Sequence, residues 1–519
     1  MQQQKQQTLE HREGVAHSLP AASGGWLRWR VVAVLTGVAL AVRLFHLDYR
    51  GLWTDEFHTL DSILLDLGGL VRDRLQAGHL PLYFILLKCW SSVAGVSEWA
   101  LRFPSAIAGA LLVPALAIFG RHQMPPPLVW GMMVLGAFNS LAVSASQEAR
   151  MYSMLAVTTT MAHYQYFRTV RQPEWTQWGW YGFWILLSAA LQPVAAIMAA
   201  GHFAFSYTVR REFPAHARRA RAIGLTLLGV TVPAAAAYML SQKRFLTPAW
   251  DVPSLEVVWN RLAQVAFGRG NLFYGHKNFL AVLMTICFFG LYLDWRAGRS
   301  GRPLMLAGER PQSPFLRFCV LSVAVPVGLL FVSRVFFTRV LGPERYFIPL
   351  TAPMFALTLW GVACLPGLWR PALTVAVAGF VALGLWGHWT DRGTGIRELA
   401  MWLIPRVHEG DVIVLRQSAT AELGLRYYGV KRAEFCHVPE RKSPEVIVSL
   451  VRDCTAGKGF FWLVNYRDNN NIVEKALAQR APSLATETER YRFGEATAAR
   501  LVLSADGAVT STAAAASAQ

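Results

Sequence analysis

The sequence predicts an α-helical polytopic membrane protein with about eleven transmembrane helices, followed by a small α/β domain. Apolar residues make up 54% of the 519-residue chain and charged residues only 16%, whereas soluble domains carry about a quarter charged residues. Nineteen Trp and fifteen Tyr suit the aromatic belts found at headgroup depth on both faces of a bilayer. After Thr390 the long apolar segments end, and short apolar strands alternate with amphipathic helices.

A membrane-spanning helix needs about 20 mostly apolar residues. Residues 1–25 are Gln-rich and polar, which predicts a disordered tail before a transmembrane domain at 26–390. A further apolar segment, 80–96, contains Lys88 and begins near Pro81, so we expect it to lie in the membrane interface. The predicted crossings are 31–47, 101–120, 128–145, 151–168, 178–191, 194–209, 222–240, 278–295, 317–333, 346–364 and 372–389.

The placement of arginines predicts the orientation, because Lys and Arg are retained on the cytoplasmic side. The two richest arginine clusters, 210–221 and 296–317, lie on the same side as the N-terminus only if 80–96 does not cross. We therefore expect a multi-pass protein of the inner membrane with a cytoplasmic N-terminus. The extracytoplasmic segments would be 48–100, 146–150, 241–277, 334–345 and all residues after 390.

The formal net charge of +18 is compatible with nucleic-acid binding, but its distribution argues against it. The arginines fall in short clusters between apolar segments, where retention beside the membrane accounts for them. Contact with membrane lipids is the simpler interpretation, and we expect no nucleic-acid partner.

The C-terminal residues 391–505 have the pattern of a small extracytoplasmic α/β domain. Strands are predicted at 411–415 and 459–464, with helices at 396–407, 444–454 and 472–480, and a disordered tail at 506–519. Cys436 and Cys454 lie in this domain without metal-ligand spacing. A disulfide between them is one alternative if the compartment is oxidising, and the spacing leaves this open.

The first candidate for chemistry is the stretch 51–58, which follows the first predicted crossing and contains Asp55, Glu56 and His58. A carboxylate pair at a membrane surface is costly unless it binds a cation, pairs with a base or accepts a proton. The alternatives are a helix cap for Asp55 and a solvated acid for Glu56.

Four motifs in order resemble the polyprenyl-phosphate-sugar-dependent glycosyltransferases of the GT-C superfamily. Within it they are similar to the bacterial branch of protein mannosyltransferases and the lipid A aminoarabinose transferase. The motifs are Trp53-Thr54-Asp55-Glu56, His79-Leu80-Pro81-Leu82-Tyr83-Phe84, Ser97-Glu98-x-x-Leu101-Arg102-x-Pro104-Ser105-x-x-x-Gly109 and Gln147-Glu148-Ala149-Arg150-Met151-Tyr152.

The resemblance implies a GT-C-like fold with an active site on the outer face. It implies a sugar donor linked to a polyprenyl phosphate, a hydroxyl acceptor on an envelope glycan, glycolipid or protein, and an inverting reaction. Asp55 matches the acid that this family uses as general base. The chemistry agrees, because a sugar phosphate carries a good leaving group and needs mainly a base and cations for the departing phosphate.

The resemblance also places substrate-binding residues. His79 would hold the acceptor or a divalent cation, although Leu80 stands where many relatives have proline. Glu148, Arg150 and Tyr152 form the fourth motif, and the guanidinium of Arg150 suits a donor phosphate.

Arg345 and Tyr346 match an Arg-Tyr pair that contacts the lipid phosphate, and we favour Arg345 over Arg339 for this role. The alternatives are ordinary ion pairs, between Glu148 and Arg150 and between Glu344 and Arg345. Arg43 is expected to extend toward the interface.

No cofactor follows from the sequence. A divalent cation bound by Glu56 with His202 or His276 stays open, because residues so distant in the chain have no readable ligand spacing. A secondary transporter or lipid flippase is the main alternative function, since it also places charges in membrane cavities. A scaffold with an inactive site is a third. The sugar and the acceptor cannot be read from loop sequences.

Overall fold

The computed structural model describes residues 27–226, 254–269, 276–299, 313–336, 344–391, 393–416, 419–439, 442–466 and 471–504. The tails 1–25 and 506–519, Arg339 and most of the predicted crossing 222–240 lie outside these ranges. The chain divides into two compact units. The helical unit comprises Met1–Phe45, Arg74–Tyr83 and Arg102–Trp389, and the sheet unit comprises His46–Asp73, Phe84–Leu101 and Thr390–Gln519.

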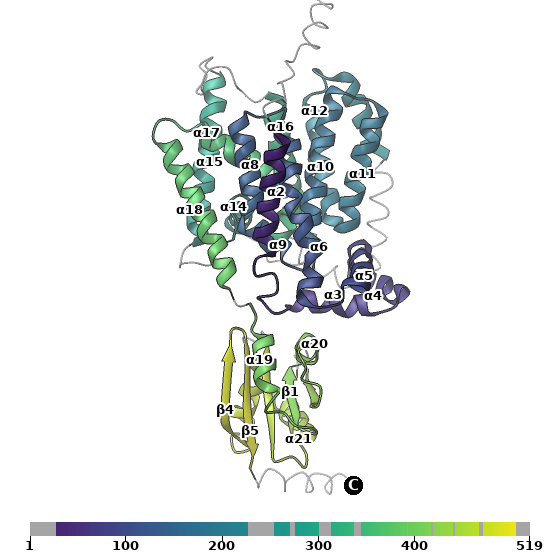
Figure 1. Ribbon diagram of the computed structural model, residues 1–519, viewed down its shortest axis with the longest axis vertical. Coiled ribbons are helices and arrows are strands. Elements are labelled where there is room, and N and C mark those ends of the chain that lie inside the picture. Colours follow the sequence, from purple (N-terminus) through teal and green to yellow (C-terminus); the bar gives the residue numbers. More distant parts are fainter. Residues whose placement is uncertain are drawn as a thin grey trace, which may run out of the picture. The chain divides into compact units, whose positions relative to one another are not determined.

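The helical unit is a bundle of long and broken helices (Figure 1). In chain order its described elements are α2 (Trp29–Leu44), α6 (Glu98–Ala110) from Arg102 onward, α7 (Leu112–Gly120), α8 (Pro126–Phe138), α9 (Ser140–Ser146), α10 (Tyr152–Arg171), α11 (Trp175–Leu191), η2 (Pro193–Ile197), α12 (Met198–Thr208), α14 (Leu255–Phe267), α15 (His276–Arg299), α16 (Ser313–Phe336), η4 (Glu344–Leu350), α17 (Thr351–Ala363) and α18 (Trp369–Thr390).

Among the described residues, five helices are long and apolar enough to cross a membrane, and the bent pair α8–α9 would make a sixth. They coincide with the predicted crossings 101–120, 128–145, 278–295, 317–333, 346–364 and 372–389. The predicted crossings 31–47, 178–191 and 194–209 form the shorter helices α2, α11 and α12, and 151–168 forms α10. A helical polytopic membrane protein is thus confirmed, whereas eleven crossings stay a prediction.

Helices α8 and α9 meet at an angle of 48° at Asn139. The Asn139 side-chain oxygen accepts hydrogen bonds from the backbone N–H groups of Leu141 (3.0 Å) and Ala142 (3.1 Å), which caps the start of α9. Its amide nitrogen donates to the carbonyls of Val265 and Ala266 in α14. Asn139 therefore fixes the break and joins it to a helix distant in the sequence.

The carbonyls left without partners at the end of α8 are bound by Arg43. Its guanidinium donates to Gly136 O (2.7 Å), to Ala137 O (3.0 Å) and to Ser146 Oγ (3.1 Å). Gly109 makes room for this contact, because a Cβ there would lie 1.9 Å from Ser146 Oγ and 2.6 Å from Arg43 Nε. The prediction that Arg43 extends to the interface is wrong: the residue is fully buried.

A chain of buried hydrogen bonds joins α10 to α11, α12 and η4. His163 Nε2–H donates to the Pro349 carbonyl (3.1 Å), which can only accept, so His163 Nδ1 accepts from His202 Nε2–H (2.8 Å). His202 Nδ1 in turn accepts from the Tyr181 hydroxyl (3.1 Å). In a membrane no water is available to these groups, so burying any one of them without a hydrogen-bond partner would cost free energy.

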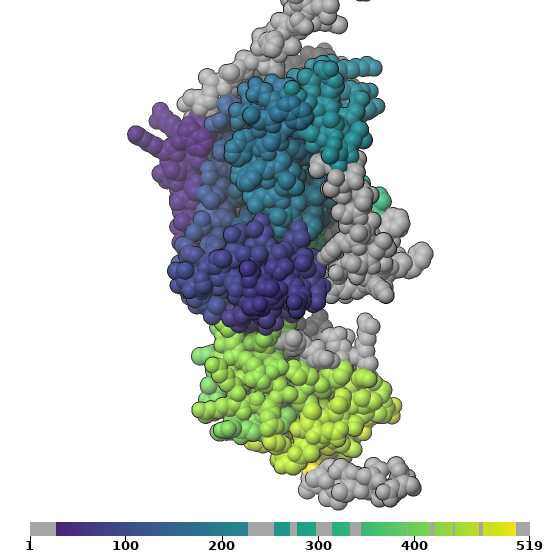
Figure 2. Space-filling model, turned by 90° about the vertical axis from the view of Figure 1, so that its right-hand side faces the viewer, coloured from purple at the N-terminus to yellow at the C-terminus, as the bar shows by residue number. Residues whose placement is uncertain are grey.

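The sheet unit contains a mixed five-stranded sheet in the order β2-β1-β3-β5-β4. Strands β2 and β3 pair parallel to β1, and β5 pairs antiparallel to both β3 and β4. The C-terminal elements are α19 (Ile396–Leu403), β1 (Val412–Arg416), α20 (Ala419–Tyr427), β2 (Glu434–Val438), α21 (Pro444–Cys454), β3 (Phe460–Tyr466), α22 (Ile472–Arg480), β4 (Ala485–Phe493) and β5 (Ala496–Leu503). Their residues form one continuous mass, green to yellow in Figure 2.

The two predicted strands and three predicted helices of this domain are present within a few residues of their expected positions. Strand β4 escaped the sequence analysis because it is largely polar and exposed. Cys436 in β2 and Cys454 at the end of α21 form a disulfide, which resolves the open alternative.

The N-terminal part of the sheet unit holds α3 (Thr54–Leu64), the start of α4 (Leu67–Gln76) and most of α5 (Leu82–Ala94). Helix α5 has 13 residues, or about 20 Å, which is shorter than the roughly 30 Å of a bilayer core. Lys88 donates to the carbonyls of Ile63 (2.8 Å) and Leu65 (2.6 Å) at the end of α3. The length of α5 agrees with the prediction that this segment lies in the interface.

Replacing Arg43 with methionine should lower the free energy of unfolding by at least about 2 kcal/mol, because two buried carbonyls lose their hydrogen bonds. Thermal or denaturant unfolding of the purified protein in detergent measures the effect. Arg30→Met is the matched control, since Arg30 is an exposed arginine on the same helix, and we expect a change below about 0.5 kcal/mol. Equal stability of the two variants would contradict the assigned role of Arg43.

Candidate active site

The acidic motif forms the first turn of α3. Glu56 is fully buried, and its carboxylate accepts the backbone N–H of Trp53 (3.3 Å), which precedes the helix. The alternative of a solvated acid at Glu56 is therefore wrong, and the side chain closes the helix start. Asp55 is half-buried beside it at the second helical position, where the positive end of the helix dipole stabilises a carboxylate.

The loop that leads into this motif is held by residues from distant parts of the sheet unit. Arg397 of α19 donates to the carbonyls of Asp48 (2.7 Å) and Tyr49 and to the Glu98 carboxylate (3.0 Å). The Tyr428 hydroxyl donates to the other Glu98 oxygen (2.5 Å) and accepts the Leu52 N–H (2.7 Å). We call this set of four residues, Leu52, Glu98, Arg397 and Tyr428, the loop clamp.

Side-chain packing reinforces the loop clamp. The ring of Phe57, two residues after Asp55, meets the rings of Tyr427 and Tyr428 edge-on. A Cβ added at Gly51 would lie 3.0 Å from Arg397 Cβ and 3.1 Å from Tyr428 Oη, so the close approach favours glycine. The C-terminal residues thus pack directly against the acidic motif, which explains how they can influence its position.

In the helical unit, the fourth motif begins as a tightly bonded loop between α9 and α10. The Gln147 amide donates to the carbonyls of Arg43 (2.8 Å) and Phe45 (2.7 Å), and its oxygen accepts from His388 Nε2 (2.7 Å). Ser105 Oγ donates to the Arg150 carbonyl (3.0 Å). These bonds fix the backbone of the loop that presents Arg150.

Arg150 and Arg345 both lie against the ring of Tyr152. The guanidinium carbons of Arg150 and Arg345 lie 6.0 Å and 5.7 Å from the ring centre of Tyr152. Arg150 is buried, with 3% of its side chain exposed. Two guanidinium groups on one tyrosine create a concentrated positive charge, which suits a phosphate group.

The segment that carries Arg345, η4, is anchored at both ends. At its start, buried Glu344 forms ion pairs with Arg261 (2.8 Å) and Arg269. Near its end, the Pro349 carbonyl accepts the hydrogen bond from His163. Glu344 therefore pairs with Arg261 in α14 and with Arg269 just after it, whereas the alternative from the sequence was a pair with Arg345. Arg345 and Tyr346 lie between these two fixed points.

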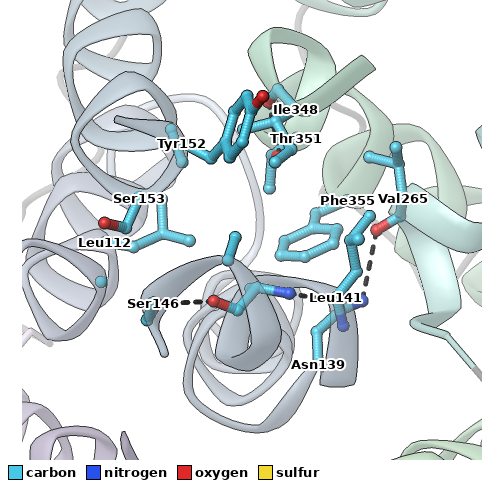
Figure 3. A pocket seen from close by; sticks show the side chains of 14 residues that line it. Leu112, Asn139, Leu141, Ser146, Tyr152, Ser153, Val265, Ile348, Thr351 and Phe355 are labelled. Carbon is cyan, nitrogen blue, oxygen red and sulfur yellow. Dashed lines mark hydrogen bonds between the residues drawn. The ribbon is translucent and has the colours of Figure 1, made fainter. Parts of the chain in front are cut away.

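A small cavity of about 20 Å³ adjoins Tyr152. Figure 3 shows the Tyr152 ring together with Ile348 and Thr351 on one side of it and Asn139 on the opposite side. This volume has room for about one water molecule and is far below the roughly 300–1,000 Å³ of ligand pockets. The cavity is therefore a packing gap behind Tyr152, too small to hold a sugar.

The predicted site residues fall into two sets. Asp55 and Glu56 belong to the sheet unit, and His79, Glu148, Arg150, Tyr152, Arg345 and Tyr346 belong to the helical unit. The backbone N–H of His79 donates to the Arg74 carbonyl (2.8 Å), which closes the turn before α5. The Glu148 carboxylate accepts from Ser144 Oγ at 3.5 Å.

The described residues contain no group of three or more His, Cys, Asp and Glu side chains arranged to hold a metal ion. Both ring nitrogens of His202 are hydrogen-bonded, to His163 and Tyr181, so this residue is not available as a ligand. The side chain of His276 lies outside the described part of the structure.

The sequence analysis missed the contacts of the loop clamp, and it missed His163 and its hydrogen bond to His202, which was named only as a possible cation ligand. Glu98 belongs to the third motif, but the sequence could not indicate its partners Arg397 and Tyr428, because they lie some 300 residues further along the chain. A polar stripe on α10, with His163, Tyr166 and Thr169 three residues apart, was the readable signal for the buried network.

No protein-family model matches the chain, and no curated protein is similar to it in sequence at a significant level. Solved structures do match. ArnT from Cupriavidus metallidurans bound to undecaprenyl phosphate has a TM-score of 0.52 and 12% sequence identity, and the match covers 92% of this chain and 98% of ArnT. The chain has a GT-C-like fold. The resemblance drawn from the motifs is confirmed at the level of the fold.

Two further solved structures match. The same ArnT in the apo state has a TM-score of 0.52 and 13% identity over 92% of this chain and 98% of ArnT. The oligosaccharyltransferase of Archaeoglobus fulgidus in the apo form matches 89% of this chain and 73% of its own, at 11% identity and a TM-score of 0.48. The two ArnT matches cover 92% of this chain, so they extend beyond the helical unit into the C-terminal residues.

Replacing Tyr428 with phenylalanine should lower the free energy of unfolding by about 1–3 kcal/mol, because Leu52 N–H and half-buried Glu98 each lose a partner. Tyr427→Phe is the matched control: its hydroxyl donates to Val96 O in an exposed hydrogen bond, and we expect a loss below about 1 kcal/mol. Denaturant unfolding, followed by Trp fluorescence, compares the two. A larger loss at Tyr427 would refute the clamp.

Burial and the neighbouring Glu98 carboxylate raise the pKa of Tyr428 well above its ordinary value of 10.0. The folded state therefore binds this proton more tightly than the unfolded state, so the stabilisation is complete below pH 10 and falls as the pH rises further. This alkaline loss should be smaller in Tyr428→Phe than in the wild type.

Proposed function

We propose that the protein is a membrane glycosyltransferase. It would transfer a sugar from a polyprenyl-phosphate donor to a hydroxyl of an envelope glycan, glycolipid or protein on the outer face of the inner membrane. The convergence of Arg150 and Arg345 on Tyr152 carries the proposal, because it concentrates positive charge where a lipid-linked phosphate can be bound. The GT-C-like fold, shared with an ArnT that binds undecaprenyl phosphate, supports it.

In the proposed reaction, the acceptor oxygen attacks the anomeric carbon of the donor sugar. The bond between that carbon and the phosphate oxygen breaks, and polyprenyl phosphate leaves with the bonding electrons. Asp55 accepts the proton of the attacking hydroxyl as general base. Attack opposite the leaving group inverts the anomeric configuration. Arg150 and Arg345 stabilise the charge that develops on the phosphate.

The remaining candidate residues take supporting roles in this proposal. Glu56 holds the helix start that presents Asp55, and we also assign this carboxylate to contact with the acceptor. His79, Glu148 and Tyr346 are assigned to substrate binding. The orientation follows the arginine clusters, with the N-terminus cytoplasmic and the sheet unit extracytoplasmic.

Asp55→Asn should abolish sugar transfer while donor binding persists, because the amide keeps the shape of the side chain but cannot accept the proton. Release of polyprenyl phosphate from a polyprenyl-phosphate sugar, measured with purified protein in detergent, is the assay. Asp61→Asn is the matched control, an exposed acid on the same helix α3, and it should retain full activity. Wild-type turnover by Asp55→Asn would exclude it as the base.

The same assay separates an enzyme from a transporter or flippase, since only an enzyme releases free polyprenyl phosphate. It requires an acceptor, and extracted envelope glycans and lipids supply candidates. Mass spectrometry of envelope glycans from a strain lacking the protein identifies which acceptor loses its sugar.

Arg345→Gln should reduce kcat by roughly 10²-fold, because a cation that stabilises the developing phosphate charge is removed. Arg345→Lys should be intermediate, since it keeps the charge but loses the planar two-pronged geometry. Arg317→Gln is the control: Arg317 makes an exposed ion pair with Glu212, which contributes little. Unchanged turnover in Arg345→Gln would remove this residue from the proposed mechanism.

A further inference from the structure

A second concave site lies at the opposite end of α10 from Tyr152. It has a volume of about 280 Å³, and its lining includes the three arginines Arg121, Arg168 and Arg171. Along helix α10, Tyr164 to Arg171 of this pocket lie about 18 to 28 Å from Tyr152, at 1.5 Å of rise per residue. The pocket is therefore independent of the candidate active site.

Two segments build the pocket. The last turns of α10 contribute Tyr164, Phe167, Arg168 and Arg171, whose spacing of three and four residues places them on one helix face. The opposing wall is Phe119 and the turn 121–123, which follows the end of α7. Arg171 donates to Gln123 Oε1 (3.3 Å), which joins the two walls.

The lining is strongly cationic. Of the described residues that line the pocket, three are arginines, one is His122 and none is acidic. The hydrogen bond of Arg168 Nε goes to the neutral side-chain oxygen of Gln172 (3.1 Å). Arg121 Nε is buried with no hydrogen-bond partner among the described residues. Positive charges that line one pocket repel one another and so raise the electrostatic energy of the folded protein. A bound anion would lower that energy.

The pocket also lies at the end of a candidate membrane span, where we expect lipid headgroups. Arg121 immediately follows Glu98–Gly120, one of the candidate membrane spans. Beside the arginines the lining is aromatic, with Phe119, Tyr164 and Phe167. A phosphate flanked by a glycerol backbone and acyl chains presents the matching combination of negative charge and apolar surface. A small soluble anion would leave the aromatic side chains without a partner.

We propose that this pocket binds the headgroup of an anionic phospholipid. The phosphate accepts hydrogen bonds from Arg121, Arg168 and Arg171, and the glycerol and first acyl carbons contact the aromatic lining. The bound lipid neutralises the arginines between α7 and α10 and so stabilises the packing of these two helices. This inference does not depend on the proposed sugar transfer.

Native mass spectrometry of the full-length protein with phosphatidylglycerol or phosphatidylcholine tests it. The wild type should retain phosphatidylglycerol over phosphatidylcholine. The double variant Arg121→Gln/Arg168→Gln should lose at least about tenfold in phosphatidylglycerol affinity, because charge-assisted hydrogen bonds to the phosphate are removed. The control Arg211→Gln/Arg218→Gln removes two exposed arginines outside the pocket and should bind as the wild type does.

Three outcomes would overturn the inference. The double variant could bind phosphatidylglycerol as tightly as the wild type, or the control could lose as much affinity, which would indicate diffuse surface charge. Glycerol phosphate could compete with the lipid at equal concentration, which would identify a soluble anion as the occupant. The single variant Arg168→Gln controls for misfolding of the double variant, because Arg168 is exposed at the helix end. It should still lose several-fold in phosphatidylglycerol affinity.

Discussion

The structure of the helical unit depends on one constraint: a polar group away from water has to find its partner inside the protein. Arg43 meets that constraint by binding the carbonyls freed where α8 breaks, and Asn139 meets it by capping α9. His163 and His202 do the same between α10, α12 and η4. Arg43, Asn139 and His163 bond backbone groups at a helix interruption, so specific hydrogen bonds hold the irregular backbone of this unit.

Those interruptions are what positions the arginine pair. Helix α9 ends in the loop of Arg150, and η4 carries Arg345 between Glu344 and Pro349, both of which are bound to other elements. A long side chain such as arginine loses considerable entropy when it is ordered. Fixing the backbone beneath it reduces that cost for a ligand, which is how preorganised sites gain affinity. The buried hydrogen bonds therefore help to position Arg150 and Arg345.

The sheet unit solves a different problem. A carboxylate at the start of a short helix would be poorly positioned by local structure alone, because α3 has 11 residues and isolated helices of that length are marginal. Arg397, Tyr428 and Phe57 tie its entry loop to α19 and α20, elements beyond the last candidate span. The C-terminal domain is thus part of the structure that holds the acidic motif. A fold match that spans 92% of the chain at 12% identity is consistent with that integration.

From the sequence we could predict the class of protein, the positions of the apolar helices, the two central strands and the motifs that contain Asp55, Arg150 and Arg345. These features follow from composition and from short-range periodicity, which a single chain carries locally. Tertiary structure alone decided that Arg43 is buried, that Cys436 bonds Cys454, that Glu98 pairs with Arg397, and that Arg150 and Arg345 share Tyr152. Each of these depends on partners that are distant in the chain, and the identity of such a partner is not encoded in the residues beside it.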